Sequence, residues 1–194
     1  RAIGTGPPRV NKITRLKSAF EPLLDLSARR GAAEFGLSRP AMGADPVCLQ
    51  GPHGPFFHRL GKMLRAAGAE VWRMGFNRGD RAFWPSASYI PYKGTLADWP
   101  QTFSALIADH AITDIVLYGD TRPIHAQAIA IARSQGLTVH VFEEGYLRPY
   151  WITYERGGAN GHSRLMQMTV PQMQKALESL DMDLPDAPAR WGDM

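Results

Sequence analysis

Short apolar segments alternate with amphipathic segments through the middle of this 194-residue chain, and this alternation constrains the fold more than any other feature. The apolar segments are predicted to be strands near residues 47–50, 70–76, 114–118 and 137–142. Helical spacing of apolar residues predicts helices at 56–68, 98–110, 122–135 and 170–180. Strands and helices in this order form right-handed crossover units around a mostly parallel sheet. We therefore predict an α/β fold, a Rossmann-like open sheet with helices on both faces.

The same pattern divides the chain into three regions. Residues 1–46 are predicted to form a leader or extension, residues 47–166 the Rossmann-like domain, and residues 167–194 a C-terminal helix with a tail or truncated linker. Two segments interrupt the alternation. Residues 77–97 begin with a predicted turn and are rich in aromatic residues, which indicates either a binding flap or rings that close one edge of the core. Residues 143–166 are predicted to be a long loop, which in a compact domain is often functional.

Composition narrows the classes of partner. The single cysteine, Cys48, excludes an internal disulfide framework and a cysteine-based zinc cluster. No apolar run approaches the ~18 residues of a membrane span, and residues 1–15 lack the apolar core of a signal peptide, so we expect a cytoplasmic protein. The formal net charge of +4 favours an anionic partner such as a membrane surface, a nucleotide or an acidic sugar, although it also fits an ordinary solvated basic surface. Because Lys and Arg form no dense run, nucleic acid is not predicted as a partner.

Ligands of an open parallel sheet collect at the carboxyl ends of the strands. The first predicted strand is followed by a loop containing Gly51 and Gly54, and then by a helix whose N-terminus offers free amides to an anion. The alternative is a tight strand-to-helix turn without a ligand. The loop does not match the G-x-G-x-x-G dinucleotide fingerprint.

The strand at 114–118 is followed by Asp120, Arg122 and His125. Asp120 occupies a position at which such sheets often place a catalytic or ribose-binding carboxylate. Alternatively, Asp120 or Thr121 caps the helix that follows, with Pro123 in its first turn, and the two roles are compatible.

Two adjacent carboxylates, Glu143 and Glu144, follow the last predicted strand. Their proximity would raise one pKa and keep that group protonated as a general acid, with Glu144 ranked before Glu143 because it lies nearer the loop. Arg148 would pair with one of them or with an anionic substrate. Simple surface charge is the alternative. The glycine-rich segment beyond contributes His162 as a further acid, base or ligand, unless it is an ordinary surface histidine.

Five segments together resemble the capsule polysaccharide biosynthesis/export family, in its KpsS-like branch. They are Gln50–Phe57, Phe76–Asp80, Gly119–Pro123, Phe142–Pro149 and Glu155–His162. The resemblance implies a retaining β-Kdo glycosyltransferase of GT-B-like fold that moves Kdo from the donor CMP-Kdo to a phosphatidylglycerol-type lipid acceptor. It also implies that this chain covers only the N-terminal half of such an enzyme and lacks the donor-binding half.

The resemblance and the residue patterns together define the expected site. The expected catalytic residues are Glu144, Glu143, Asp120 and His162, lining one cleft at the carboxyl edge of the sheet. The expected substrate-binding residues are Gly51, Gly54, Arg122, His125, Arg148 and Asn160. No cofactor and no metal are expected. The expected partners are the nucleotide-sugar donor, the lipid acceptor, the periphery of the inner membrane and other capsule assembly proteins.

Two other functions remain open from the sequence. A non-catalytic glycolipid-binding subunit of a capsule export system fits the short chain. A metal-dependent hydrolase would take its oxygen and nitrogen ligands from Asp120, His125, Glu144 and His162. Against the hydrolase, no H-x-H or H-E-x-x-H spacing concentrates ligands.

Overall fold

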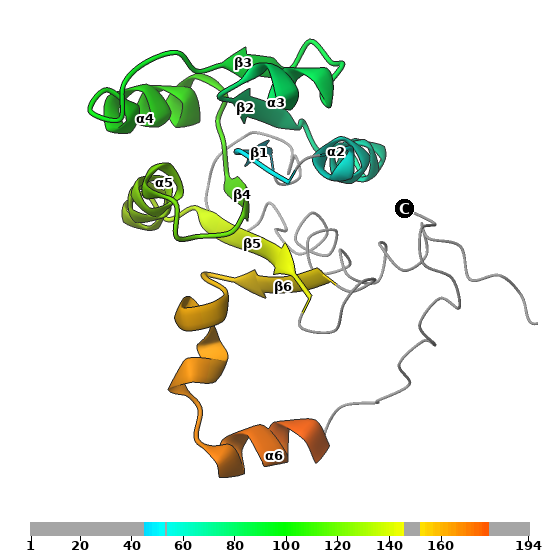
Figure 1. Cartoon of the computed structure of the whole chain (residues 1–194), viewed down its shortest axis with the longest axis vertical. Coiled ribbons are helices and arrows are strands. Elements are labelled where there is room, and N and C mark those ends of the chain that lie inside the picture. The colour runs from blue at the N-terminus through cyan, green and yellow to red at the C-terminus, as the bar shows by residue number, and fades with distance from the viewer. Residues whose placement is uncertain (1–44, 53, 146–151, 179–194) are drawn as a thin grey trace, which may run out of the picture.

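A computed structural model describes residues 45–52, 54–145 and 152–178 (Figure 1). The predicted leader therefore lies outside the described residues except for Asp45 and Pro46, and the predicted tail after residue 178 lies outside them as well. Arg148 also falls in a range that is not described.

In the described part of the chain, six strands form one sheet in the order β3-β2-β1-β4-β5-β6. The strands are β1 (Pro46–Cys48), β2 (Trp72–Gly75), β3 (Tyr89–Pro91), β4 (Asp114–Tyr118), β5 (Thr138–Glu144) and β6 (Ile152–Arg156). All neighbours pair in parallel except β5 and β6, which are antiparallel. The predicted open, mostly parallel α/β sheet is thus confirmed.

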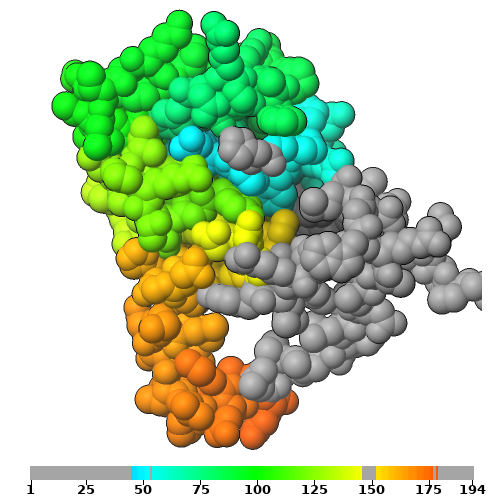
Figure 2. Space-filling model, viewed as in Figure 1, coloured from blue at the N-terminus to red at the C-terminus, as the bar shows by residue number. Residues whose placement is uncertain are grey.

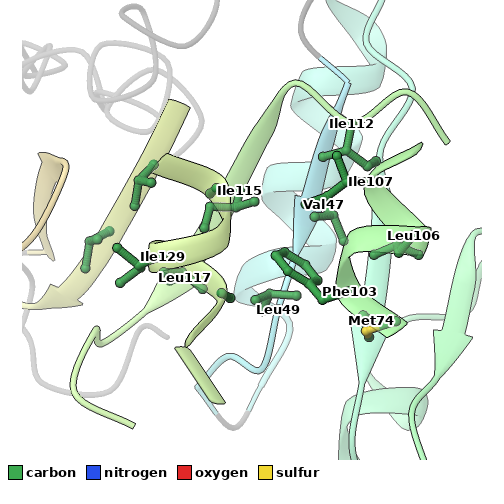
Figure 3. Packing of buried hydrophobic residues seen from close by; sticks show 14 of the residues in the cluster. Val47, Leu49, Met74, Phe103, Leu106, Ile107, Ile112, Ile115, Leu117 and Ile129 are labelled. Atoms are coloured by element: carbon green, nitrogen blue, oxygen red, sulfur yellow. The ribbon is translucent and has the colours of Figure 1, made fainter. Parts of the chain in front are cut away.

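Helices cover both faces of this sheet (Figure 1). They are α2 (Phe56–Ala66), α3 (Arg78–Ala82), α4 (Trp99–Asp109) and α5 (Pro123–Ser134), whereas a further helix, α6 (Val170–Glu178), does not cover the sheet. Side chains alternate between the two faces along each strand, so β4 contributes Ile115 and Leu117 to one core and Val116 to the other. The first core packs under α4 and α5, with Phe103 and Ile129 against the sheet (Figure 3). The second packs under α2.

The prediction of a long loop at 143–166 is wrong. The segment contains strand β6 and two short 3-10 helices, Asn160–His162 and Arg164–Gln167. Strand β5 extends through Glu143 and Glu144 because these residues pair with Thr153 and Ile152 of β6. An edge strand that is half exposed carries no continuous apolar run, so the sequence of β6 gives little periodic signal.

The turn predicted at residues 77–80 is also wrong, because it is the start of α3. The side chain of Asn77 accepts a hydrogen bond from the amide of Asp80 at 2.9 Å and so caps the helix. The aromatic residues that follow mostly close the edge of the core, which was one of the two interpretations. Trp84 is 1% exposed and packs against α2, whereas Phe83 is 43% exposed.

The C-terminal helix α6 lies apart from the sheet, at the lower end of the molecule in Figures 1 and 2. Exposed apolar side chains gather on it and on the 3-10 turn before it, including Leu165, Met166 and Val170. Among the described residues, no helix has the length and apolar character needed to cross a membrane.

Candidate functional site

The strand order reverses direction at the centre of the sheet, between β1 and β4. From β1 the chain passes through α2 to β2 on one side, and from β4 it passes through α5 to β5 on the other. Since α2 and α5 cover opposite faces, a crevice is expected between the carboxyl ends of β1 and β4, where sheets of this kind bind ligands. A ligand is therefore expected beside the residues that follow β1 and β4.

The turn after β4 is held rigidly. Gly119 has a φ of +75°, a conformation that favours glycine, and its amide donates to the Phe142 carbonyl at 2.8 Å. Its carbonyl lies 2.7 Å from Nδ1 of His125 on α5, so this nitrogen carries the proton and donates. The turn is thereby fixed both to β5 and to α5, and it places Asp120 at the carboxyl edge with 3% of the residue exposed.

Asp120 connects the sheet to the segment that follows β6. Its Oδ2 accepts a hydrogen bond from the amide of Ala159 at 2.9 Å and another from Nδ1 of His162 at 3.1 Å. Oδ1 accepts none from the described residues, so it is the oxygen left for a ligand. The His162 side chain is 62% exposed, so its ring reaches solvent while Asp120 stays buried. The structure thus brings together Asp120 and His162, which the sequence placed in one site.

Glycine at position 158 permits this contact. A Cβ on Gly158 would lie 2.7 Å from Cβ and from the backbone oxygen of His162, closer than side chains tolerate. Any larger residue at position 158 would therefore displace His162 from Asp120.

His125 is completely buried, and burial together with the nearby Arg122 charge lowers its pKa to about 4. The ring is therefore neutral at pH 7. With Nδ1 donating to Gly119, Nε2 is a buried acceptor that finds no hydrogen-bond partner among the described residues. In the structure His125 orients the Gly119–Asp120 turn, and it has no exposed surface on which to contact a substrate directly.

The loop after β1 lies against a buried ion pair between β2 and α3 that the sequence did not reveal. Gly51 lies so close to Phe57 that a Cβ would fall 2.4 Å from the ring, and 3.3 Å from the Arg73 guanidinium. Arg73 donates to Asp80 at 2.8 Å, with 5% and 7% of the two side chains exposed. Gly54 adopts a φ of +122°. The charge of Arg73 is offset by Asp80, so this pair fixes the floor of the expected crevice rather than adding net positive charge to it.

The two glutamates do not form a pair on one side of the sheet. As neighbours in β5, they point to opposite faces. An oxygen of Glu143 would lie 3.3 Å from a Cβ on Gly119, on the edge that carries Asp120. Glu144 is exposed on the side of α2. The structure therefore groups Glu143 with the Gly119–Asp120 turn and separates Glu144 from it.

The remaining expected ligands lie at the surface. Arg122 precedes α5 as its N-cap residue and is exposed. Asn160 is exposed, has a φ of +51° and begins the 3-10 helix that carries His162. Among the described residues, no group of three or more His, Cys, Asp or Glu side chains is arranged to hold a metal ion. Asp120, His125, Glu144 and His162 are thus not brought together as a ligand set.

Comparison with known proteins shows a resemblance to one protein family. Residues 113–177 match the family model described as capsule polysaccharide biosynthesis protein, and this range includes both Asp120 and His162. The resemblance to the capsule polysaccharide biosynthesis family is confirmed.

Two relatives extend the match towards the N-terminus. The chain is similar to the capsule polysaccharide export protein KpsS of Escherichia coli, with 37% identity over 123 residues, which is 63% of this chain and 32% of that protein. It is also similar to the capsule polysaccharide modification protein LipB of Neisseria meningitidis serogroup A, with 41% identity over 121 residues, 61% of this chain and 29% of that protein. The chain thus spans about a third of the length of these curated relatives.

The region that matches the family model, residues 113–177, contains a second His–Asp pair that the sequence did not reveal. Nε2 of His140 lies 2.9 Å from Oδ1 of Asp114, and Nδ1 lies 2.8 Å from the Tyr154 hydroxyl. His140 and Asp114 are 0% and 2% exposed, so the pair is enclosed by β4, β5 and β6. A histidine in the middle of an apolar strand was the available signal, because a buried imidazole requires partners.

Proposed function

We propose that this chain carries the acceptor-side half of a capsule glycosyltransferase that moves Kdo from CMP-Kdo to a phosphatidylglycerol-type lipid with retention of configuration. The observation that carries the proposal is the Asp120–His162 pair at the point where the strand order reverses. The family match to residues 113–177 and the similarity to a capsule export protein and a capsule modification protein support the choice of pathway.

The chemistry of a retaining transfer fits this pair. Such a reaction uses either a carboxylate nucleophile or a front-face route, together with a group that moves a proton. The bond from the sugar to CMP breaks and CMP leaves with the electron pair. A new bond forms between the sugar and the acceptor oxygen, whose proton must be taken up.

We assign these two roles to the two side chains. Oδ1 of Asp120 faces the sugar, because Oδ2 is already occupied by Ala159 and His162. His162 takes up the acceptor proton at Nε2, because Nδ1 is committed to Asp120 and the ring is exposed. Arg122, at the N-terminus of α5, provides a positive charge for the anionic sugar or the lipid phosphate.

The geometry favours Asp120 over Glu144, the carboxylate that the sequence ranks first. Asp120 is buried and hydrogen-bonded at the point where the strand order reverses. Glu144 lies on the face of β5 opposite to Glu143, away from the Gly119–Asp120 turn. Glu143 lies beside Gly119 and is the next candidate after Asp120.

The test is Kdo transfer from CMP-Kdo to detergent-dispersed phosphatidylglycerol-type lipid by this chain together with a donor-binding half, with the product measured by mass spectrometry. Asp120→Asn and His162→Ala are expected to lower turnover by roughly 10²–10⁴-fold, the usual contribution of a positioned acid or base. The matched control is Asp109→Asn, an exposed residue at the end of α4 that is expected to keep wild-type turnover.

Three outcomes would contradict the proposal. Wild-type turnover in both Asp120→Asn and His162→Ala would remove these residues from the reaction. Loss of turnover in Glu144→Gln alone would support the assignment made from sequence. Binding of the lipid without any turnover, even when a donor-binding half is supplied, would support a non-catalytic glycolipid-binding subunit instead.

A further inference from the structure

One side of the molecule, formed by α2 and α3, carries an excess of exposed positive charge. We call this surface the basic face and define it by Arg59, Lys62, Arg78, Arg81 and Phe83. All five side chains are exposed. Between residues 54 and 97 the sequence has seven Lys and Arg but only two acidic residues, Glu70 and Asp80.

The positive charge of the basic face is not neutralised locally. Asp80 is buried, and its two oxygens accept hydrogen bonds from Arg73 and from the amide of Phe76. Glu70 lies beyond the C-terminal end of α2. Within the described residues, no salt bridge involves Arg59, Lys62 or Arg78. These side chains are therefore not neutralised by any other described residue.

The two helices form one continuous surface. Trp84, just after α3, packs so tightly on α2 that a Cβ on Gly61 would lie 2.5 Å from the indole. The Arg65 guanidinium lies 5.0 Å from the centroid of the same ring. Figure 1 shows α2 and α3 on the same side of the sheet. Trp84 thus joins the end of α3 to α2, the two helices that carry the cations of the basic face.

Phe83 adds an apolar group at the end of α3. It is 43% exposed and follows Arg81 by two residues, while the rest of the aromatic segment packs inward. An exposed ring beside several cations suits the boundary between lipid headgroups and acyl chains, where aromatic and basic side chains bind together.

We propose that the basic face docks on an anionic membrane surface. Clusters of four or more Lys and Arg bind the anionic headgroups of a bilayer, and each cation near the surface contributes roughly fivefold to the affinity. A membrane fits better than nucleic acid, because the cations are spread over two short helices around one apolar ring and form no run along the chain.

The docking does not depend on the proposed transfer reaction, although the two are compatible. Helix α3 follows the carboxyl end of β2, so the basic face borders the edge of the sheet at which Asp120 lies. A chain docked in this way would hold that edge near a lipid acceptor.

The experiment is co-sedimentation of the chain with vesicles of phosphatidylcholine and with vesicles of equal parts phosphatidylcholine and phosphatidylglycerol. The wild-type chain is expected to bind the anionic vesicles, and more weakly as salt is added. The double variant Lys62→Glu/Arg78→Glu is expected to lose at least ~25-fold in affinity. The matched control, Arg164→Glu/Lys175→Glu, makes the same charge change at exposed positions outside the basic face and is expected to bind within about twofold of wild type.

Equal losses in the two double variants would overturn the assignment to this face. Equal binding to neutral vesicles, or tighter binding to a DNA duplex than to anionic vesicles, would overturn the choice of partner. Transfer activity with detergent-dispersed lipid serves as the independent readout. Membrane docking can fail while transfer persists in Lys62→Glu/Arg78→Glu, so the two proposals are distinguishable.

Discussion

Two histidine–aspartate pairs occupy different regions of this sheet, and their surroundings give them different properties. His140 and Asp114 are buried within β5 and β4. Nε2 of His140 is hydrogen-bonded to Asp114, and the other ring nitrogen, Nδ1, is hydrogen-bonded to the Tyr154 hydroxyl. His162 and Asp120 lie at the carboxyl edge, where the aspartate is buried but the histidine is 62% exposed. The first pair is closed to substrates and the second is open on one side.

The comparison shows that the residue types alone do not identify a reactive site. A pair whose hydrogen-bonding groups are all satisfied within the fold stabilises the fold. A pair that keeps one carboxylate oxygen and one ring nitrogen without an intramolecular partner, at the point where the strand order reverses, can bind a substrate and react with it. Three predictions test this distinction, and they are ordered by the size of the expected effect.

Breaking the closed pair is expected to have the largest effect on stability. Asp114→Ala leaves His140 buried without its acidic partner, which costs about 3–5 kcal/mol. Burial raises the pKa of Asp114, but hydrogen bonds from His140 and Thr113 outweigh it, so the pKa lies below the ordinary value of 3.8. Because the folded state favours the charged form, the stabilisation is present at neutral pH and disappears as the pH falls below 3.8.

Urea denaturation at neutral and acid pH measures this effect. Asp120→Asn is the comparison variant, because its pair is open and its loss is expected to affect transfer more than stability. An equal loss of stability in Asp114→Ala and Asp120→Asn would show that the two pairs do not differ in the way described.

A third histidine, His125, sharpens the comparison because its own hydrogen bond is to a backbone carbonyl rather than to an acid. Its pKa is lowered from 6.5 to about 4, mainly by burial. The unfolded chain therefore binds a proton more readily, and stability is lost as the pH falls from 6.5 towards 4. The loss is on the order of 3 kcal/mol.

His125→Asn retains a side-chain donor for Gly119 but cannot take up a proton in this range. The slope of unfolding free energy against pH between 6.5 and 4 is expected to flatten in this variant. The same slope in both proteins would mean that His125 is not the group responsible.

The smallest effect is expected from Tyr154→Phe. The change removes the hydroxyl that lies 2.8 Å from His140 while leaving the Asp114 contact in place. A hydrogen bond of this kind contributes about 1 kcal/mol. The measurement is the midpoint of urea unfolding, and a loss as large as that of Asp114→Ala would show that the phenol, not the carboxylate, is the main partner of His140.

The sequence predicted the parts of the fold that have strong periodic signals. Strand β4 and helices α4 and α5 were found nearly to the residue, because their apolar residues repeat at strand or helix spacing. Strand β6 was missed because it lies at an edge and its residues are half exposed. Helix α3 was missed because it has only five residues, too few for a periodic pattern.

The site could be predicted only in part, for a related reason. Asp120 was predicted because ligands of a parallel sheet collect at the carboxyl ends of its strands, and His162 was predicted because it lies in a glycine-rich segment. That they form a hydrogen bond depends on β6 reversing the chain, which the sequence did not indicate. The ranking of Glu144 assumed that the strand had already ended, whereas pairing with β6 continues it through residue 144.

The hydrogen bond between Asp120 and the amide of Ala159 joins parts of the chain that are 39 residues apart. This hydrogen bond requires β4, β5 and β6 to be in place together, because Asp120 follows β4 and Ala159 follows β6. The rate at which the Ala159 amide exchanges with deuterated water is consequently a direct reporter of assembly at this edge of the sheet. A chain can thus possess a nearly complete parallel core, with β1 to β5 in place, and still lack the geometry that brings His162 to Asp120.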